Sequence, residues 1–312
     1  MFQNFLSCDW GTSHFRLRMV DARSLEILAE IKTDEGAARI FQRSTPETRA
    51  QDFAETLARR IEAIFQQAEC EAISCIVSGM ASSAMGWLEV PYSVAPMPLE
   101  TARLNTRKIV LPVGRLAVDV TIVSGVRTDD DVMRGEECEL LGLLALNPAL
   151  ASSDCWMILP GTHSKHVWVV DRVLMTFVTS MTGELFRHLH TLPTLKSLLS
   201  QGIEISEPRF CEGVWAGKKF GLLAGLFKVR SRALISPSPL DHESSFLSGL
   251  LIGSELSTLP PHGAIYLAGS GSLHSLYLTG ARELGLPLQA LSPETVKKAI
   301  VHAHRMFLPQ DQ

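Results

Sequence analysis

Two short turns with matching residue types are the first candidates for chemistry in this chain. They are Asp9-Trp10-Gly11-Thr12-Ser13-His14 and Pro160-Gly161-Thr162-His163-Ser164-Lys165. A glycine lets backbone N–H groups come close to an anion, and neighbouring hydroxyl groups add further hydrogen-bond donors. The matched pair therefore predicts two phosphate-binding turns, and the alternative is that both are simple tight hairpin turns.

A carboxylate stands directly beside the first turn. Asp9 could hold Mg²⁺ through water, and phosphoryl transfer requires such a metal ion. The second turn contains His163, the one histidine of the chain whose position suggests a function. Lys165, at the end of that turn, could neutralise developing charge or point to solvent.

Two further segments could contact a ligand. Gly269-Ser270-Gly271 lies between an expected strand and an expected helix, where backbone groups can meet a nucleoside or phosphate, although a plain strand-to-helix turn is equally consistent. The stretch from Asp131 to Glu137 places acids and Arg134 at a helix N-terminus. The acids there could only complement the helix dipole, or Arg134 could grip a substrate carboxylate beside a catalytic base.

The composition narrows the class of protein. The 312 residues are 46% hydrophobic, and 29 Lys and Arg stand against 33 Asp and Glu, a net charge of −4. This balance argues against nucleic acid as the main partner, because proteins that bind nucleic acid normally carry an excess of Lys and Arg. No apolar run reaches the length of a membrane helix, and residues 1–4 are unlike a signal peptide. We therefore expect a cytoplasmic protein with free cysteines and a small-molecule substrate.

Hydrophobic periodicity predicts an α/β protein in which the two halves are similar. Gly11 precedes Asp21 by 10 residues, and Gly161 precedes Asp171 by 10 residues, in the same order of strand, turn, strand, turn and strand. The expected strands are 5–8, 15–19, 25–31, 73–77, 118–123, 156–159, 167–170, 173–178 and 264–267. The expected helices are 48–68, 134–146, 182–189, 211–227, 244–258, 273–284 and 294–307.

The ordered series of motifs resembles the 2-keto-3-deoxygalactonate kinase (2-dehydro-3-deoxygalactonokinase) family of the actin-like, sugar-kinase ATPase superfamily. Besides the two turns, with Arg16 after the first, the resemblance covers these segments: Ser78-Gly79-Met80 with Ser83, Gly86-Trp87 and Pro91-Tyr92; Val132-Met133-Arg134-Gly135-Glu136-Glu137 with Leu140-Leu141-Gly142; Met181-Thr182-Gly183-Glu184-Leu185-Phe186; Phe246-Leu247-Ser248-Gly249-Leu250-Leu251-Ile252-Gly253; and Ala268-Gly269-Ser270.

The resemblance implies two actin-like (ribonuclease H-like) domains, 1–148 and 149–312, with mixed sheets and an interdomain nucleotide cleft. It implies ATP-dependent phosphorylation of the 6-hydroxyl of 2-dehydro-3-deoxy-D-galactonate, with Mg²⁺ held at Asp9 and a homodimer as one option for assembly. Asp131 would be the base, with Glu136 as the alternative. The phosphate and nucleoside contacts would come from Gly11, Thr12, Ser13, Gly161, Thr162, His163, Ser164, Lys165, Gly269, Ser270 and Gly271. The substrate contacts would come from Gly79, Met80, Ser83, Trp87, Arg134, Glu137, Thr182 and Glu184.

Two residues depart from the pattern of this family. Ser82 stands where glycine is expected, and Ala84 stands where a polar or basic residue is common. Both lie in the expected sugar-binding segment, so they bear on the identity of the acid sugar. Two alternatives to the implied activity stay open. One is a kinase for another keto-deoxy sugar acid, and the other is a nucleotide-dependent switch of the same superfamily, which would not need Trp87, Arg134 or Glu136.

Overall fold

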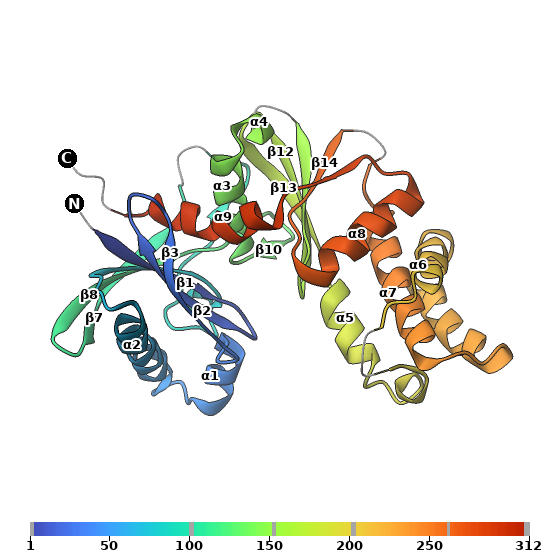
Figure 1. Ribbon diagram of the computed structural model, residues 1–312, viewed down its shortest axis with the longest axis horizontal. Coiled ribbons are helices and arrows are strands. Elements are labelled where there is room, and N and C mark those ends of the chain that lie inside the picture. The colour runs from blue at the N-terminus through green and yellow to red at the C-terminus, as the bar shows by residue number, and fades with distance from the viewer. Residues whose placement is uncertain (1–2, 100–102, 152–153, 201–203, 261–262, 309–312) are drawn as a thin grey trace. The chain divides into compact units, whose positions relative to one another are not determined.

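The computed structural model describes residues 3–99, 103–151, 154–200, 204–260 and 263–308 (Figure 1). The chain divides into two compact units, which we call unit 1 and unit 2. Unit 1 consists of Met1–Ser152, Asp171–Thr176 and Glu294–Gln312, and unit 2 consists of Ser153–Val170 and Phe177–Pro293. The sequence analysis placed all residues from 149 onward in one domain, whereas this division groups the C-terminal residues with unit 1.

The main sheet of unit 1 has six strands in the order β3-β2-β1-β4-β8-β7. Its strands are β1 (Asn4–Trp10), β2 (Phe15–Asp21), β3 (Ile27–Thr33), β4 (Ser74–Gly79), β7 (Thr106–Val113) and β8 (Leu116–Val123). The long helix α2 (Arg49–Ala68) packs one apolar face against the core of this unit, as the period of its apolar residues predicts. The buried residues of this face are Phe53, Leu57, Ile61 and Ile64.

Shorter elements complete unit 1. A small sheet joins β10 (Val132–Met133), β9 (Val126–Arg127) and β5 (Ser93–Val94), and β6 (Met97–Pro98) pairs with the first residues of β13. The helices are α1 (Ala37–Arg43), α3 (Glu136–Leu146), α4 (Pro148–Ala151) and α9 (Pro293–Arg305), with a 3₁₀ turn at Met80–Ser82. The sequence analysis anticipated neither β7 nor α1.

The sheet of unit 2 contains β11 (Cys155–Leu159), β12 (Ser164–Val170), β14 (Ala264–Leu267) and β15 (Leu288–Ala290). It also contains β13 (Val173–Ser180), whose residues up to Thr176 are grouped with unit 1. The helices of unit 2 are α5 (Thr182–Leu189), α6 (Glu207–Ile235), α7 (Leu240–Leu256) and α8 (Gly271–Leu284), with a 3₁₀ turn at Lys196–Leu198. Within the described residues, no helix is both long enough and apolar enough to span a bilayer.

The two main sheets share one strand order. The order β3-β2-β1-β4-β8 corresponds to β13-β12-β11-β14-β15. In both, the first strand pairs antiparallel with the second and parallel with the fourth, β1 with β4 and β11 with β14. The mixed α/β fold and the similarity of the two halves, both expected from the sequence, are confirmed.

Helices α6 and α7 cross at a distance that only glycine permits. A Cβ on Gly213 would lie 2.1 Å from the Phe246 carbonyl oxygen, and a Cβ on Gly249 would lie 2.0 Å from the Phe210 carbonyl oxygen. These contacts are with backbone atoms, which cannot move aside as a side chain can. The two helices are therefore held in one register by the absence of side chains at these positions.

Gly249→Ala should destabilise unit 2 by about 2–4 kcal/mol, because the added methyl group forces α6 and α7 apart. Denaturant unfolding measures this change. The matched control is Gly280→Ala in α8, where the new methyl would meet only side-chain carbons of Ile252 and Leu256 at 3.2 Å. Equal stability of the two variants would contradict the close crossing.

The C-terminal helix α9 packs against α3 of unit 1, and its residue His304 hydrogen-bonds two serines of that unit. A Cβ on Gly142 of α3 would lie 1.7 Å from the Ala299 carbonyl oxygen of α9, and Figure 1 shows α9, in red, beside α3. His304 is fully buried, with Nδ1 2.8 Å from Ser7 Oγ and Nε2 3.0 Å from Ser78 Oγ. These contacts explain why residues 294–308 belong to unit 1.

His304 should make the stability of unit 1 depend on pH. Burial, and then the positive charge of Arg18, lowers its pKa to about 3. The unfolded chain therefore binds a proton near pH 6.5 that the folded chain does not, so stability falls as pH drops below that value. From pH 7.5 to pH 4.5 this residue alone should remove about 2–3 kcal/mol.

The comparison that isolates this effect is between the wild-type chain and His304→Asn. Their difference in unfolding free energy, measured by denaturant titration, should be largest at pH 7.5 and should shrink toward pH 4.5. Other groups with shifted pKa values are common to both chains, so their contributions cancel. A difference that stays constant across this range would show that His304 is not held neutral.

Candidate functional site

The first Gly-Thr turn joins β1 to β2 and is supported by the start of α1. The Gly11 N–H donates to the His14 carbonyl at 2.9 Å, and the Ala38 N–H donates to the Thr12 carbonyl at 3.1 Å. Gly36 permits this approach, since a Cβ there would lie 2.3 Å from the same Thr12 oxygen. Thr12 and Ser13 are exposed. The turn thus presents its hydroxyl groups outward from a fixed backbone.

Asp9 lies at the end of β1, beside this turn and opposite Arg16 of β2. Its carboxylate is 3.9 Å from Arg16 Nη1, and its side chain is 28% exposed. Burial raises the pKa of Asp9, Arg16 and Arg18 oppose that rise, and the negative charge of Glu136 adds to it. Asp9 and Glu136, both candidates from the sequence, are therefore close enough to interact electrostatically.

Glu139 joins this group, and the sequence analysis missed it. Burial raises its pKa to about 8, and repulsion from Glu136 and Asp9 contributes. The signal was its spacing, because residues three apart on a helix share a face and Glu139 follows Glu136 by three. Among the described residues, no group of three or more Asp, Glu, His or Cys is arranged to hold a metal ion directly.

The backbone at the N-terminus of α3 lies close to the last residue of β4. Gly135 has φ +112°, and a Cβ there would lie 3.5 Å from the Cα of Gly79. Glu137 accepts a hydrogen bond from the Gly135 N–H at 2.7 Å and is 1% exposed. Burial, and then the charge of Glu136, raises the pKa of Glu137 to about 8. This glutamate is therefore mostly protonated at neutral pH and caps its own helix.

Arg134 is held by the residue that departs from the family pattern. Its Nη1 donates to the Ser82 carbonyl at 2.7 Å and to Ser82 Oγ at 2.6 Å. Its guanidinium carbon lies 4.1 Å from the centre of the Tyr92 ring. Arg134 Nε is buried and has no hydrogen-bond partner within the described part of the chain. The guanidinium is thus fixed in orientation while one of its donors is unsatisfied.

Three other residues predicted for substrate binding or catalysis in unit 1 have different surroundings. Ser83 Oγ donates to the Met80 carbonyl at 2.7 Å. Asp131 accepts a hydrogen bond from the Val132 N–H at 2.7 Å. Trp87 is 8% exposed and packs in the core of unit 1. The roles of Ser83, Asp131 and Trp87 in substrate binding or catalysis stay predictions.

The second Gly-Thr turn repeats the backbone arrangement of the first. Here the start of α5 supports it, because the Glu184 N–H donates to the Thr162 carbonyl at 2.9 Å. A Cβ on Gly183 would lie 2.5 Å from the Gly161 oxygen. His163 Nε2 lies 2.6 Å from the Glu184 carboxylate, and this hydrogen bond lowers the pKa of Glu184. The predicted residues of this turn and of α5 are therefore neighbours.

Ser164 and Thr182 share a partner that the sequence analysis did not single out. Both hydroxyl groups donate to Glu255 of α7, Ser164 at 2.7 Å. His166 Nε2 at 2.8 Å and the Tyr277 hydroxyl at 2.7 Å also bond this carboxylate. Burial would raise the pKa of Glu255, but these hydrogen bonds and the His166 charge outweigh it and lower the pKa. Glu255 is a buried, ionised carboxylate.

The remaining residues predicted to contact the nucleotide in unit 2 are Lys165, near the start of β12, and Gly269, Ser270 and Gly271, at the start of α8. Lys165 is 3% exposed, and its Nζ donates to the His163 carbonyl at 3.1 Å, so this lysine does not point freely to solvent. Gly271 begins α8 with φ +62°. His274 Nδ1 lies 3.1 Å from the Gly269 carbonyl, which fixes that turn.

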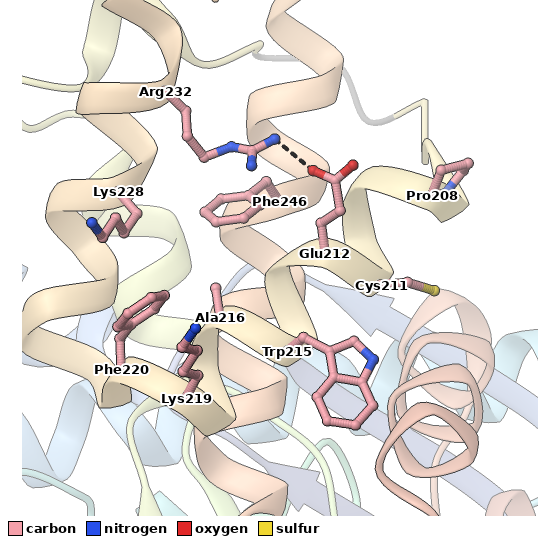
Figure 2. A pocket seen from close by; sticks show the side chains of 10 residues that line it. All are labelled: Pro208, Cys211, Glu212, Trp215, Ala216, Lys219, Phe220, Lys228, Arg232 and Phe246. Carbon is pink, nitrogen blue, oxygen red and sulfur yellow. Dashed lines mark hydrogen bonds and ion pairs between the residues drawn. The ribbon is translucent and has the colours of Figure 1, made fainter. Parts of the chain in front are cut away.

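Two cavities lie at different distances from the predicted site residues of unit 2. One, of about 560 Å³, lies between the two halves of α6, which changes direction at Gly221 (φ +66°). Figure 2 shows the residues that line this cavity, among them Trp215, Lys219 and Arg232. None of the lining residues is one of the catalytic, phosphate-binding or substrate-binding residues predicted from the sequence. The second, of about 320 Å³, is lined by Thr182 and Glu255 together with neighbouring hydroxyl and apolar groups. Only the second cavity adjoins the predicted site residues.

Comparison with known proteins adds an independent observation. The family described as 2-keto-3-deoxy-galactonokinase matches residues 9–303. The chain is 32% identical to "Probable 2-dehydro-3-deoxygalactonokinase" of Rhizobium meliloti (strain 1021), over 98% of each chain. It is 28% identical to the 2-dehydro-3-deoxygalactonokinase of Escherichia coli (strain K12), covering 97% of this chain and 99% of that one.

A solved structure agrees with these matches. A crystal structure from Sinorhizobium meliloti, described as a 2-dehydro-3-deoxygalactonokinase protein, superposes with a TM-score of 0.81 at 30% identity. The match covers 99% of this chain and 98% of that one. The similarity spans both units and all the motifs that suggested it. The chain therefore belongs to the 2-keto-3-deoxy-galactonokinase family.

Proposed function

We propose that this chain transfers a phosphoryl group from ATP to the 6-hydroxyl of 2-dehydro-3-deoxy-D-galactonate. The observation that carries the proposal is the Arg134 guanidinium anchored on Ser82, in a residue whose backbone N–H bonds Glu136. Glu136 in turn is close enough to Asp9 to raise its pKa. A cation with an unsatisfied donor suits a sugar acid, and an adjacent carboxylate suits proton removal from an alcohol. A nucleotide switch would need neither.

The phosphate groups would be held by the two Gly-Thr turns. Thr12 and Ser13 of the first turn and Thr162 of the second are exposed, and both turns are fixed by backbone hydrogen bonds from a neighbouring helix. Preorganised donors of this kind stabilise developing charge without reorganising during the reaction. Gly269, Ser270 and Gly271 would contact the nucleoside.

The base would be Asp131, with Glu136 as the alternative. Asp131 accepts a hydrogen bond from its neighbour's N–H, and Glu136 accepts one from the Arg134 N–H at 3.0 Å. Either carboxylate would take the proton of the attacking hydroxyl as the phosphoryl group is transferred. Gly79, Met80, Ser83, Trp87, Glu137 and Glu184 would contribute to substrate binding. Thr182, also predicted from the sequence as a substrate contact, gives its hydroxyl proton to Glu255.

Mg²⁺ belongs to the same proposal, with Asp9 as its holder. The donor chemistry fits, because Mg²⁺ prefers oxygen ligands, retains several waters and needs only one or two carboxylates. Burial raises the pKa of Asp9 and Glu139, and repulsion from Glu136 adds to the rise in both. A nearby cation would relieve this repulsion. When bound, the ion would neutralise charge on the phosphate oxygens.

A cytoplasmic homodimer is the remaining part of the proposal. Support comes from large apolar side chains on α6 that are exposed in the single chain, Leu223 at 87%, Phe227 at 67% and Ile235 at 81%. Exposed apolar groups gathered on one helix are typical of a protein interface. A second copy of the chain would cover them.

Asp9→Asn should lower turnover by orders of magnitude with little change in folding, since it keeps the size of the side chain and removes its charge. Coupled assays of ADP release over a range of Mg²⁺ concentrations measure this. Asp34→Asn, at an 84% exposed carboxylate near the same turn, is the matched control. Near-normal turnover in folded Asp9→Asn would remove Asp9 from the site.

Arg134→Met should reduce kcat/KM for the acid sugar by a factor corresponding to about 2–5 kcal/mol, as for a truncated buried charge pair. The slow ATP hydrolysis that occurs without sugar should change little. Assays with 2-dehydro-3-deoxygalactonate, with its gluconate isomer and with a neutral sugar measure both the loss and the acid preference.

Arg127→Met, an exposed arginine of β9, is the control for loss of a positive charge in the same region. Equal losses of sugar-stimulated and background ATP turnover in Arg134→Met would mean that Arg134 is structural. If no keto-deoxy sugar acid stimulates ATP turnover in the wild-type chain, the proposed activity itself is wrong.

A further inference from the structure

Glu255 occupies a position that no motif of the sequence indicated. It lies near the C-terminal end of α7, is 4% exposed and receives four hydrogen bonds from side chains. Oε1 bonds Ser164 and His166, and Oε2 bonds Thr182 and Tyr277. The donors come from three different elements, β12, α5 and α8. One carboxylate therefore connects four elements of unit 2.

Two of these donors stand at the ends of the segments that hold the second Gly-Thr turn. Ser164 is the first residue of β12 and directly follows the turn. Thr182 is the first residue of α5, and the next two residues, Gly183 and Glu184, approach Gly161 and bond Thr162. Any shift of either donor relative to Glu255 would move the backbone of the turn.

The same bonds make Ser164 and Thr182 poor direct ligands. The Ser164 side chain is completely buried, and its hydroxyl proton is committed to Glu255. Thr182 likewise gives its hydroxyl proton to this carboxylate. Each hydroxyl group has one proton, so neither can donate to a phosphate oxygen while these bonds persist.

We propose that Glu255 is a positioning residue of the nucleotide site, which sets the geometry of the second phosphate turn by holding Ser164 and Thr182. This inference rests on the proposed function and deepens it. Ser164 and Thr182 then act through Glu255, whereas the backbone of the turn and the exposed Thr162 meet the phosphates. An ionised carboxylate is required, because only it accepts four hydrogen bonds at once.

Glu255→Gln keeps the size of the side chain, removes its charge and replaces one acceptor with a donor. The donors at Thr182 and Tyr277, or those at Ser164 and His166, then face an N–H group. We expect the dissociation constant for Mg²⁺-ADP to rise about tenfold or more, because the turn loses its preorganised geometry. The KM for the sugar acid at saturating ATP should change less than twofold.

Glu243→Gln is the matched control. Glu243 is a second buried glutamate of α7, 2% exposed, whose carboxylate accepts a hydrogen bond from Ser238 Oγ at 2.6 Å. It precedes Glu255 by 12 residues on the same helix, which is about 18 Å along the axis. Its substitution should lower thermal stability and leave the affinity for Mg²⁺-ADP unchanged, since within the described residues its carboxylate oxygens hydrogen-bond no residue of β12 or α5.

Isothermal titration with Mg²⁺-ADP, which does not depend on activity, separates the outcomes. If the wild-type chain binds no adenine nucleotide, both the proposed function and this inference are overturned. If the wild-type chain binds and folded Glu255→Gln binds equally well, only this inference is overturned. Equal loss of affinity in Glu243→Gln and Glu255→Gln would also overturn it, because the effect would then be general destabilisation of α7.

Tyr277→Phe keeps the test decisive if Glu255→Gln does not fold. It removes one donor to Oε2 and leaves the carboxylate and its other three partners in place. We expect a rise of about threefold or more in the dissociation constant for Mg²⁺-ADP, with the sugar-acid KM unchanged. An affinity within twofold of the wild-type value in this folded variant would contradict the inference.

Discussion

Both Gly-Thr turns depend on one backbone constraint, a hydrogen bond from the start of a helix to the threonine carbonyl. The Ala38 N–H bonds Thr12, and the Glu184 N–H bonds Thr162, and in each case a glycine lets the helix come close enough. The first N–H groups of a helix have no partner within it, so the turn satisfies them. Each turn is thereby rigid before any ligand arrives, while its exposed threonine remains available.

The acidic residues near the two turns have pKa values shifted in opposite directions. In unit 1, burial raises the pKa of Asp9 and Glu139, and repulsion from Glu136 adds to the rise in both. In unit 2, Glu255 is more deeply buried but its pKa is lowered, because four donors satisfy it. An acidic group whose pKa is raised by burial and by neighbouring carboxylates is suited to bind a cation or a proton. A carboxylate that accepts four hydrogen bonds is suited to hold neighbouring segments in place.

The position where this chain departs from the family pattern has a structural explanation. Ser82 gives two oxygen atoms to Arg134, its carbonyl and its hydroxyl, and a glycine would offer only the first. The same hydroxyl group donates to the Gly79 carbonyl at 3.1 Å. Ser82 therefore links the end of β4 to the arginine at the start of α3, and it orients the guanidinium together with Tyr92.

The sequence by itself determined the elements and the turns, because these follow from local patterns. Alternating and helical periods predicted most strands and helices, and the equal offsets from Gly11 to Asp21 and from Gly161 to Asp171 predicted the repeated strand order. The ordered motifs also identified the family. These features depend on residues near one another in the chain, where spacing is informative.

Only the tertiary structure decided which side chains meet across long stretches of chain. Glu255 and Ser164 are separated by 91 residues, and His304 and Ser7 by 297. No periodicity predicts such pairs, so the sequence patterns singled out neither Glu255 nor His304. The grouping of α9 with unit 1 follows from the same kind of contact, because the close approach of Ala299 to Gly142 and the buried bonds of His304 arise only after the chain has folded.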